Sequence, residues 1–137
     1  MGTRAGAKTN RGWEMKEIKL RVFDKLSKLM FKNDEIIWNS GKVIKLYDQD
    51  WFSVNQKDIE LMQYTGLKDC KGDDIYDGDI VLIKERNFMP NDKFKDAIAT
   101  VEFSNGMFMI DNDYPTSVDL SKTVVIGNIY ENSELLK

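Results

Sequence analysis

Two residue types on which much of protein chemistry depends are absent or nearly absent from this chain. Its 137 residues contain no histidine and one cysteine, Cys70. Histidine is the commonest general base and transition-metal ligand, so its absence removes every Ser/His and Cys/His catalytic arrangement. A single cysteine cannot form a disulfide within the chain or supply a thiolate zinc site. We therefore expect a protein that is not an enzyme and that binds no cofactor.

The chain also lacks a long apolar run. No segment approaches the roughly 20 apolar residues that cross a bilayer, and no signal-peptide stretch comes before Met15. The apolar content of 42% and the charged content of 31% are typical of a soluble globular protein. We expect a cytoplasmic protein with no membrane association.

The first 14 residues, MGTRAGAKTNRGWE, are small, polar and basic, and they show no apolar periodicity. This composition predicts a flexible N-terminal extension, an expression remnant or an upstream start, with Met15 as the natural beginning. Residues 15–137 have the length of one domain. The sequence therefore predicts one folded domain over 15–137, preceded by an extension over 1–14.

Basic side chains concentrate near the N-terminus, although the net charge is −3. Residues 1–32 contain nine basic side chains and three acidic ones. A solvated charged face is the usual explanation of such a run. The alternative is an edge, with Lys19 and Arg21 at its centre, that contacts nucleic-acid phosphates.

Alternation and β-branched runs predict a mainly β protein. Residues 16–23 have the period of a half-buried strand. The side chains expected on its two faces are Ile18, Leu20 and Val22 on one and Lys19, Arg21 and Phe23 on the other.

Turn residues divide the following segments into hairpins. DEIIWNSGKVIKLY has two β-rich runs about Asn39, Ser40 and Gly41, and Asn105-Gly106 separates ATVEF from GMFMI. Residues 87–95 have the composition of a surface loop. Residues 58–64 fit either a helical turn or a short strand.

Two strands have special features. Ile80 to Ile83 are apolar at every position, which predicts a strand covered on both faces. Gly127 interrupts the β-branched segment TVVIGNIYE, where we expect a bulge or a close backbone approach. Asn132 is placed to cap a short C-terminal helix. The sequence predicts a small β-barrel or sandwich-like fold with short helical segments.

Aromatic side chains gather in the first hairpin and just after it. Trp38 and Trp51 are candidates for a binding surface, with Tyr47 and Phe52 close by in sequence. Cross-strand packing explains such residues in most sheets, and a face that stacks bases or another ligand is the alternative.

The segment Leu61–Ile83, LMQYTGLKDCKGDDIYDGDIVLI, contains the remaining candidates. Tyr64 and Thr65 are candidate ligand contacts. Asp77 and Asp79 are candidates for a cation site or for the acid–base pair of a metal-dependent hydrolase, since residues two apart share a face of an extended strand. An EF-hand register starting at Asp73 fails because Ile75 and Lys84 occupy ligand positions. Turn formation by Asp and Gly is the better explanation, so we expect no metal site.

The same segment also carries a resemblance. MQYTGLKDCKGDDIYDGDIV resembles the signature of the YopX family of bacteriophage and prophage proteins, and two further segments agree: EIKLRVFDKLSKLMF near the N-terminus and VVIGNIYENSELL at the C-terminus. The resemblance implies a phage or prophage protein with a β-rich fold and no established activity. With no catalytic arrangement in the sequence, we expect a binding or adaptor protein that acts on a host or phage protein and that forms homo-oligomers.

Overall fold

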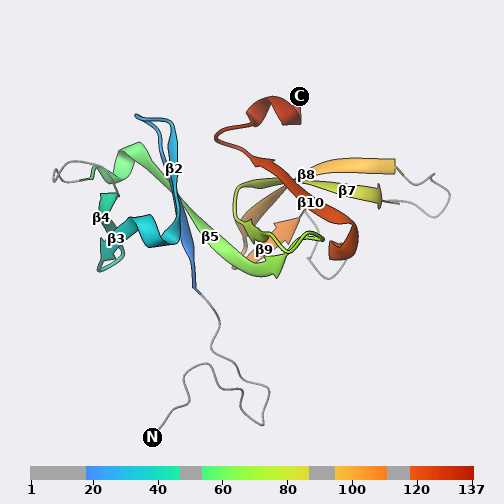
Figure 1. Ribbon diagram of the computed structural model, residues 1–137, viewed down its shortest axis with the longest axis horizontal. Coiled ribbons are helices and arrows are strands. Elements are labelled where there is room, and N and C mark those ends of the chain that lie inside the picture. The colour runs from blue at the N-terminus through green and yellow to red at the C-terminus, as the bar shows by residue number, and fades with distance from the viewer. Residues whose placement is uncertain (1–17, 47–53, 87–94, 111–117) are drawn as a thin grey trace, which may run out of the picture.

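The computed structural model describes residues 18–46, 54–86, 95–110 and 118–137, and in these ranges the protein is mainly β, as predicted (Figure 1). The strands are β1 (Leu20–Asp24), β2 (Leu29–Phe31), β3 (Ile36–Asn39), β4 (Lys42–Leu46), β5 (Ile59–Lys68), β6 (Asp74–Tyr76), β7 (Asp79–Arg86), β8 (Lys95–Ser104), β9 (Met107–Ile110) and β10 (Thr123–Asn128). Short 3-10 helices connect them: η1 (Asn33–Glu35), η2 (Gln56–Asp58), η4 (Leu120–Lys122) and η5 (Ser133–Leu136).

The strands form two groups joined by the long strand β5. One sheet has the order β2-β1-β5-β6, a second has the order β10-β7-β8-β9, and β3 and β4 form a two-stranded hairpin. The first part of β5 pairs with β1, and its later part pairs with β6. Figure 1 shows β5 crossing from the group that contains β2, β3 and β4 to the group that contains β7 to β10. We call residues 18–46 the first lobe and residues 74–137 the second lobe.

Each lobe has a small apolar core of its own. The core of the first lobe consists of Val22, Phe31, Val43 and Leu46. The core of the second lobe consists of Ile75, Val81, Ile83, Ala99, Val101, Ile110 and Val118. Ile80, Val81 and Ile83 are all buried, so β7 is covered on both faces, as its apolar run predicts.

Both predicted hairpins are present. Ser40 and Gly41 in the β3–β4 turn have positive φ, as do Asn105 and Gly106 in the β8–β9 turn. Two consecutive positive φ angles characterise the type I′ turn, whose twist matches that of the flanking strands. The undecided segment 58–64 is largely strand, because β5 pairs with β1 from Ile59 onward.

The faces of the first strand were predicted only in part. Leu20 and Val22 are buried, but Ile18 precedes β1 and is 79% exposed. Phe23 was expected on the opposite face with Lys19 and Arg21, yet it is buried as well. Its ring stacks on Tyr130 from the C-terminal segment, with the centroids 5.4 Å apart. The side of β1 expected to be polar is therefore apolar at this end.

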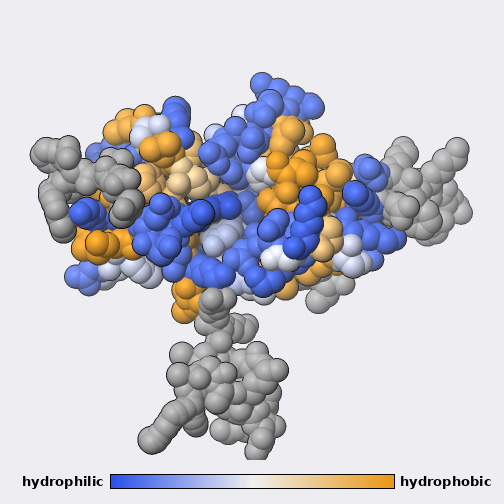
Figure 2. All heavy atoms as spheres, in the orientation of Figure 1, coloured by the Kyte–Doolittle hydropathy of each residue, from blue (hydrophilic) through white to orange (hydrophobic). Residues whose placement is uncertain are grey.

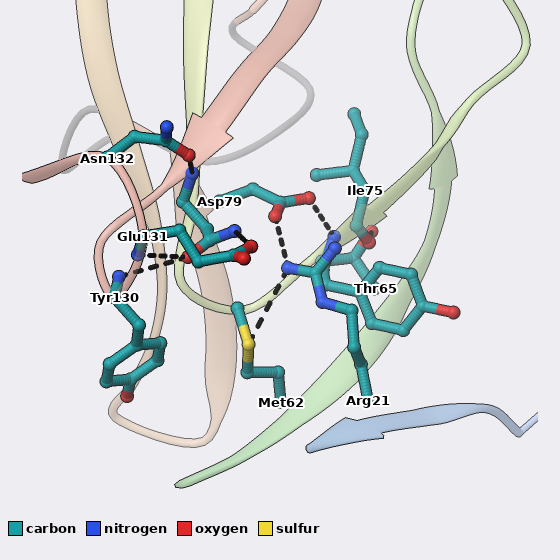
Figure 3. A network of polar contacts seen from close by, with 10 residues as sticks. Arg21, Met62, Thr65, Ile75, Asp79, Tyr130, Glu131 and Asn132 are labelled. Atoms are coloured by element: carbon teal, nitrogen blue, oxygen red, sulfur yellow. Dashed lines mark hydrogen bonds and ion pairs between the residues drawn. The ribbon is translucent and has the colours of Figure 1, made fainter. Parts of the chain in front are cut away.

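The bulge predicted at Gly127 is present, but the predicted cap by Asn132 is wrong. The β10–β7 register shifts between Val125 and Gly127. The side chain of Asn132 makes no capping bond to η5; its Oδ1 instead accepts a hydrogen bond from the backbone N–H of Asn128 (3.1 Å, Figure 3). A Cβ atom at position 127 would lie 2.5 Å from that oxygen, so the glycine leaves room for Asn132 to reach back.

Several predictions concern residues outside the described ranges: the extension over 1–14, the aromatic residues Tyr47, Trp51 and Phe52, and the loop up to residue 94. Within the described ranges, no helix has the length and apolar content needed to cross a bilayer.

Candidate functional site

Three of the candidate residues lie together on one face of the sheet β2-β1-β5-β6. Lys19 and Arg21 are two residues apart on an extended segment and so share a face. The backbone N–H of Tyr64 donates to the carbonyl oxygen of Lys19 (3.0 Å), and Tyr64 lies opposite Tyr76 on β6. We call the resulting group the cation–tyrosine cluster; its members are Lys19, Arg21, Tyr64, Lys68, Asp74, Tyr76 and Asp79.

At the centre of the cluster, Arg21 forms an ion pair with Asp79. Its Nη2 donates to Asp79 Oδ1 and lies 3.6 Å from Met62 Sδ (Figure 3). Asp79 Oδ2 accepts the backbone N–H of Tyr76 (2.8 Å), and the Arg21 guanidinium lies 4.4 Å from the Tyr76 ring centroid. Asp79 is only 1% exposed. Burial raises the pKa of this carboxyl, and the charge of Arg21 opposes the rise.

The rim of the cluster is a second charge network, built on Asp74. Its two carboxylate oxygens accept hydrogen bonds from Lys19 Nζ (2.7 Å) and Lys68 Nζ (2.5 Å). Burial favours the neutral form of Asp74, but the hydrogen bonds from the two lysines outweigh it and hold the pKa of Asp74 below its ordinary value. The same two ammonium groups lie 4.9 Å and 6.0 Å from the ring centroid of Tyr64. The lysines thus share one carboxylate and one aromatic ring.

These contacts determine what the cluster can do chemically. The charges of Lys19 and Arg21, the candidates for a phosphate-binding edge, are opposed by Asp74 and Asp79. Asp79 is buried and fully engaged, so it offers no open carboxylate to a substrate or a metal ion. In the part of the chain that the structure describes, no group of three acidic or cysteine side chains is arranged to hold a metal ion.

Asp77 and Asp79 have different partners in this structure. Asp77 lies in the turn between β6 and β7, and its carboxylate accepts the backbone N–H of Phe103. Burial raises the pKa of Asp77, and that hydrogen bond opposes the rise. Gly78 between them has a φ of +91°, a conformation that glycine adopts readily. For this segment, turn formation accounts for the aspartates better than a cation site does.

Thr65 has a structural role. Its Oγ1 donates to the carbonyl oxygen of Ile75 (2.7 Å) and accepts the backbone N–H of Leu67 (3.1 Å). These bonds lie where the β5–β6 register shifts, between Tyr64 and Lys68. The hydroxyl therefore stabilises the irregular part of β5.

Sequence reasoning missed Asp69, which connects the β5–β6 turn to the second sheet. Its Oδ1 accepts the backbone N–H groups of Lys71 and Asp73 (both 2.9 Å), and its Oδ2 accepts that of Val125 on β10 (2.9 Å). Burial raises the pKa of Asp69, but the three hydrogen bonds outweigh it, so the pKa lies below its ordinary value. The Asp-x-x-Gly spacing of Asp69 and Gly72 signals the turn, while the long-range bond to Val125 has no local signature.

Exposed apolar side chains lie on both hairpins of the first lobe and also on β8 and β9 of the second lobe. Trp38, the described member of the predicted aromatic surface, is 47% exposed on β3 beside Ile37. In the β1–β2 hairpin, Leu26 is 75% exposed and Leu29 is 52% exposed. Figure 2 shows apolar surface at the upper edge of the first lobe, where Figure 1 places the β1–β2 turn. Trp38 thus lies on the β3–β4 hairpin, whereas Lys19, Arg21 and Tyr64 of the cation–tyrosine cluster belong to β1, its N-terminal end and β5.

Fold and contacts together define a small mainly β protein whose clustered charges are joined in ion pairs. The chain belongs to the YopX family: the family model described as YopX protein matches residues 10–137. The predicted resemblance is thereby confirmed. A solved structure described as protein EF1440 from Enterococcus faecalis has a similar fold, with a TM-score of 0.63 at 23% identity over 88% of this chain and 99% of that one. No curated protein matches the chain.

Proposed function

We propose that this YopX-family chain is a non-enzymatic binding or adaptor protein, encoded by a phage or prophage, that acts on a host or phage protein in the bacterial cytoplasm. The observation that supports the proposal most is the exposure of Leu26, Leu29 and Trp38 on two hairpins of the first lobe. Exposed apolar groups of this kind, close to charged ones, are typical of protein interaction surfaces.

The charged groups support a binding role in a second way. The clustered side chains that carry acid–base chemistry are engaged in contacts that hold the sheets together, as in the pairs Arg21–Asp79 and Lys19–Asp74. Catalysis by a carboxylate requires a group that reaches the substrate. Leu26, Leu29 and Trp38 are, by contrast, exposed apolar side chains, and covering them by a partner would be favourable, so a docking role fits them better.

Affinity capture tests the proposal when it is combined with matched variants. Three forms of the full chain are immobilised and exposed to lysate of the infected host: the wild type, a first-lobe variant and a second-lobe variant. The first-lobe variant is Leu26→Ser/Trp38→Ser. The second-lobe variant is Ile98→Ser/Phe103→Ser, and it serves as the control because the residues it replaces are also exposed. We expect one protein to be retained by the wild type and the second-lobe variant and lost from the first-lobe variant. That protein, once purified, should bind the chain with fixed stoichiometry; if no protein is retained by any form, the proposal fails.

A second copy of the chain is one partner that this test includes. Homo-oligomers would use the same exposed hairpins, because a second copy would cover Leu26, Leu29 and Trp38 as any other partner would. Light scattering of the wild type and the first-lobe variant distinguishes this case. A multimer that persists in the first-lobe variant would separate self-association from the hairpin surface.

Nucleic-acid binding is the second candidate, and the cation–tyrosine cluster favours it. The ring centroids of Tyr64 and Tyr76 are 5.7 Å apart, and the ammonium groups of Lys19 and Lys68 lie close to the Tyr64 ring. Aromatic rings with cations beside them can stack a base and contact its phosphate. The ion pairs to Asp74 and Asp79 count against it, since they reduce the positive charge offered to phosphates. Binding to single-stranded RNA or DNA that falls steeply with salt and is lost in Lys68→Glu would establish it.

A further inference from the structure

The four-residue turn between β1 and β2 is held in place by a buried carboxylate. Asp24 Oδ1 accepts the backbone N–H of Leu26 (3.0 Å), and Asp24 Oδ2 accepts the hydroxyl of Ser27 (2.8 Å). The carbonyl oxygen of Asp24 accepts the N–H of Lys28 (2.8 Å), and the N–H of Lys25 donates to the carbonyl oxygen of Asp58 (2.8 Å). Every residue of the turn is therefore bound to a fixed group.

These bonds hold an unfavourable backbone conformation. Lys28 has a φ of +62°, which is uncommon for a residue with a Cβ atom. Such conformations persist where the surroundings determine them, and they are frequent at binding sites. A turn that is rigid before binding loses little conformational entropy when a partner engages it.

The rigid turn presents exposed apolar side chains in a segment that also carries exposed lysines. Leu26 is the most exposed large apolar side chain of the described residues apart from Ile18, and Leu29 follows the turn directly. Residues 25–32, KLSKLMFK, contain three lysines and no acidic residue. Lys25 bonds to Glu60 on β5 (3.1 Å), whereas Lys28 and Lys32 are both exposed.

We propose that this turn is the part of the first lobe that enters the partner protein, with Leu26 and Leu29 filling an apolar pocket whose rim carries Asp and Glu side chains. This inference rests on the proposed function and names the chemistry of the partner. Leucines are matched by an apolar pocket, and the lysines around them are matched by carboxylates on its rim.

Other occupants fit the turn less well. A nucleic acid offers base faces, and those are bound by aromatic side chains, of which the turn has none. A bilayer binds a peripheral protein stably only through more apolar area than two leucines supply. A protein pocket needs only a small apolar anchor with charged surroundings.

The experiment compares two double variants that carry the same substitutions at different places. The turn variant is Leu26→Ser/Lys28→Glu, and the control is Leu136→Ser/Lys137→Glu at the C-terminus, where both residues are likewise exposed. Thermal unfolding first establishes that both fold, and Trp38→Ser serves as a third form. The affinity of each full-length form for the purified captured protein is then measured by titration calorimetry at low and moderate salt.

We expect the turn variant to bind at least about tenfold more weakly than the wild type, with the control unchanged, as for an interface hot spot. Suppose instead that the captured protein binds the turn variant as tightly as the wild type and binds only the Trp38→Ser form more weakly. That result would overturn this inference and leave the proposed function standing. If no form binds a protein, both fail. Two further probes are vesicles of phosphatidylcholine with phosphatidylglycerol and a single-stranded oligonucleotide. If either binds the wild type but not the turn variant, the inference is also overturned, because the occupant of the turn would not be a protein.

Discussion

Arg21 and Asp79 form an ion pair between residues 58 positions apart, one at the start of the first lobe and the other at the start of β7. Asp79 also accepts the backbone N–H of Tyr76, so one carboxylate joins β1, β6 and β7. The two lobes have separate cores, and β5 is the strand they share. The pair therefore connects the lobes beside β5, as do the Phe23–Tyr130 stack and the Lys19–Asp74 ion pair, and it accounts for two residues that the sequence marks as candidates for binding.

Removing one partner of this pair should destabilise the protein strongly. Arg21→Met leaves the Asp79 carboxylate buried without its counter-charge, and we expect a loss of about 3–5 kcal/mol in the free energy of unfolding. Urea denaturation measures it. The double variant Arg21→Met/Asp79→Asn should lose less free energy of unfolding than the two single variants lose in sum. The second substitution removes the uncompensated charge and keeps an acceptor for the N–H of Tyr76.

The exposed pair Lys25–Glu60 provides the control for this prediction. Both side chains are more than a third exposed, so Lys25→Ala, which leaves the contact of Glu60 with Tyr130 in place, should change the free energy of unfolding by about 0–1 kcal/mol. A loss for Arg21→Met no larger than that of Lys25→Ala would contradict the connecting role of Arg21.

Asp69 should give the protein a distinct sensitivity to acid. Its pKa in the folded state lies below the ordinary value of 3.8, so its three hydrogen bonds contribute stability that is present above that value and lost as the pH falls through the folded pKa. In Asp69→Asn, the side-chain amide cannot accept all three N–H groups, because its NH₂ group would face one of them. We therefore expect the free energy of unfolding to fall by about 1–3 kcal/mol at neutral pH. Urea denaturation over a pH series measures both effects. The difference in the free energy of unfolding between wild type and Asp69→Asn should shrink below pH 3.8. A difference that stays constant with pH would show that the Asp69 carboxylate is not the source of the acid sensitivity.

Gly127 should tolerate alanine poorly because of Asn132. The added Cβ would lie 2.5 Å from Asn132 Oδ1 and 2.8 Å from Asn132 Cβ, so Asn132 must give up its bond to the Asn128 N–H. We expect Gly127→Ala to lower the free energy of unfolding by about 1–3 kcal/mol. In an Asn132→Ala background, Gly127→Ala should lower the free energy of unfolding by a smaller amount. An equal decrease in both backgrounds would show that the clash with Asn132 is not the cause.

Asp24 should control the rigidity of the β1–β2 turn. Asp24→Ala removes the acceptors of the Leu26 N–H and the Ser27 hydroxyl, so the Leu26 amide should exchange with deuterium faster than in the wild type. Ser27→Ala removes one side-chain donor and leaves the bond to Leu26 in place. Amide exchange at Leu26 should therefore be faster in Asp24→Ala than in Ser27→Ala; equal rates in the two variants would show that the carboxylate does not hold the turn.

Local patterns in the sequence predicted much of the fold. Asn105-Gly106 and Ser40-Gly41 predicted their hairpins because the turn type depends on the conformations those residues adopt. The apolar run from residue 80 to 83 likewise predicted a covered strand. Long-range contacts were not predictable in this way: the burial of Phe23 depends on Tyr130, far along the chain.

The candidate site shows the same division. Lys19, Arg21 and Tyr64 were singled out by charge and motif, and the structure brings them together, but their carboxylate partners could not be assigned without the pairing of β1, β5 and β6. Exposure of Leu26 was missed altogether. Alternation of apolar and polar residues places side chains on the faces of a strand and does not describe a four-residue turn.

Photo-cross-linking from position 26 would identify the molecule that contacts the β1–β2 turn. A photoreactive amino acid replaces Leu26 in one full-length protein and Leu136 in another; both positions are exposed, so neither replacement should disturb the fold. Irradiation in infected-host lysate, followed by mass spectrometry, identifies what lies against each position. We expect a single protein to be cross-linked from position 26 and not from position 136, at a peptide where apolar residues adjoin Asp or Glu. The same products from both positions, or none from position 26, would contradict a docking role for this turn.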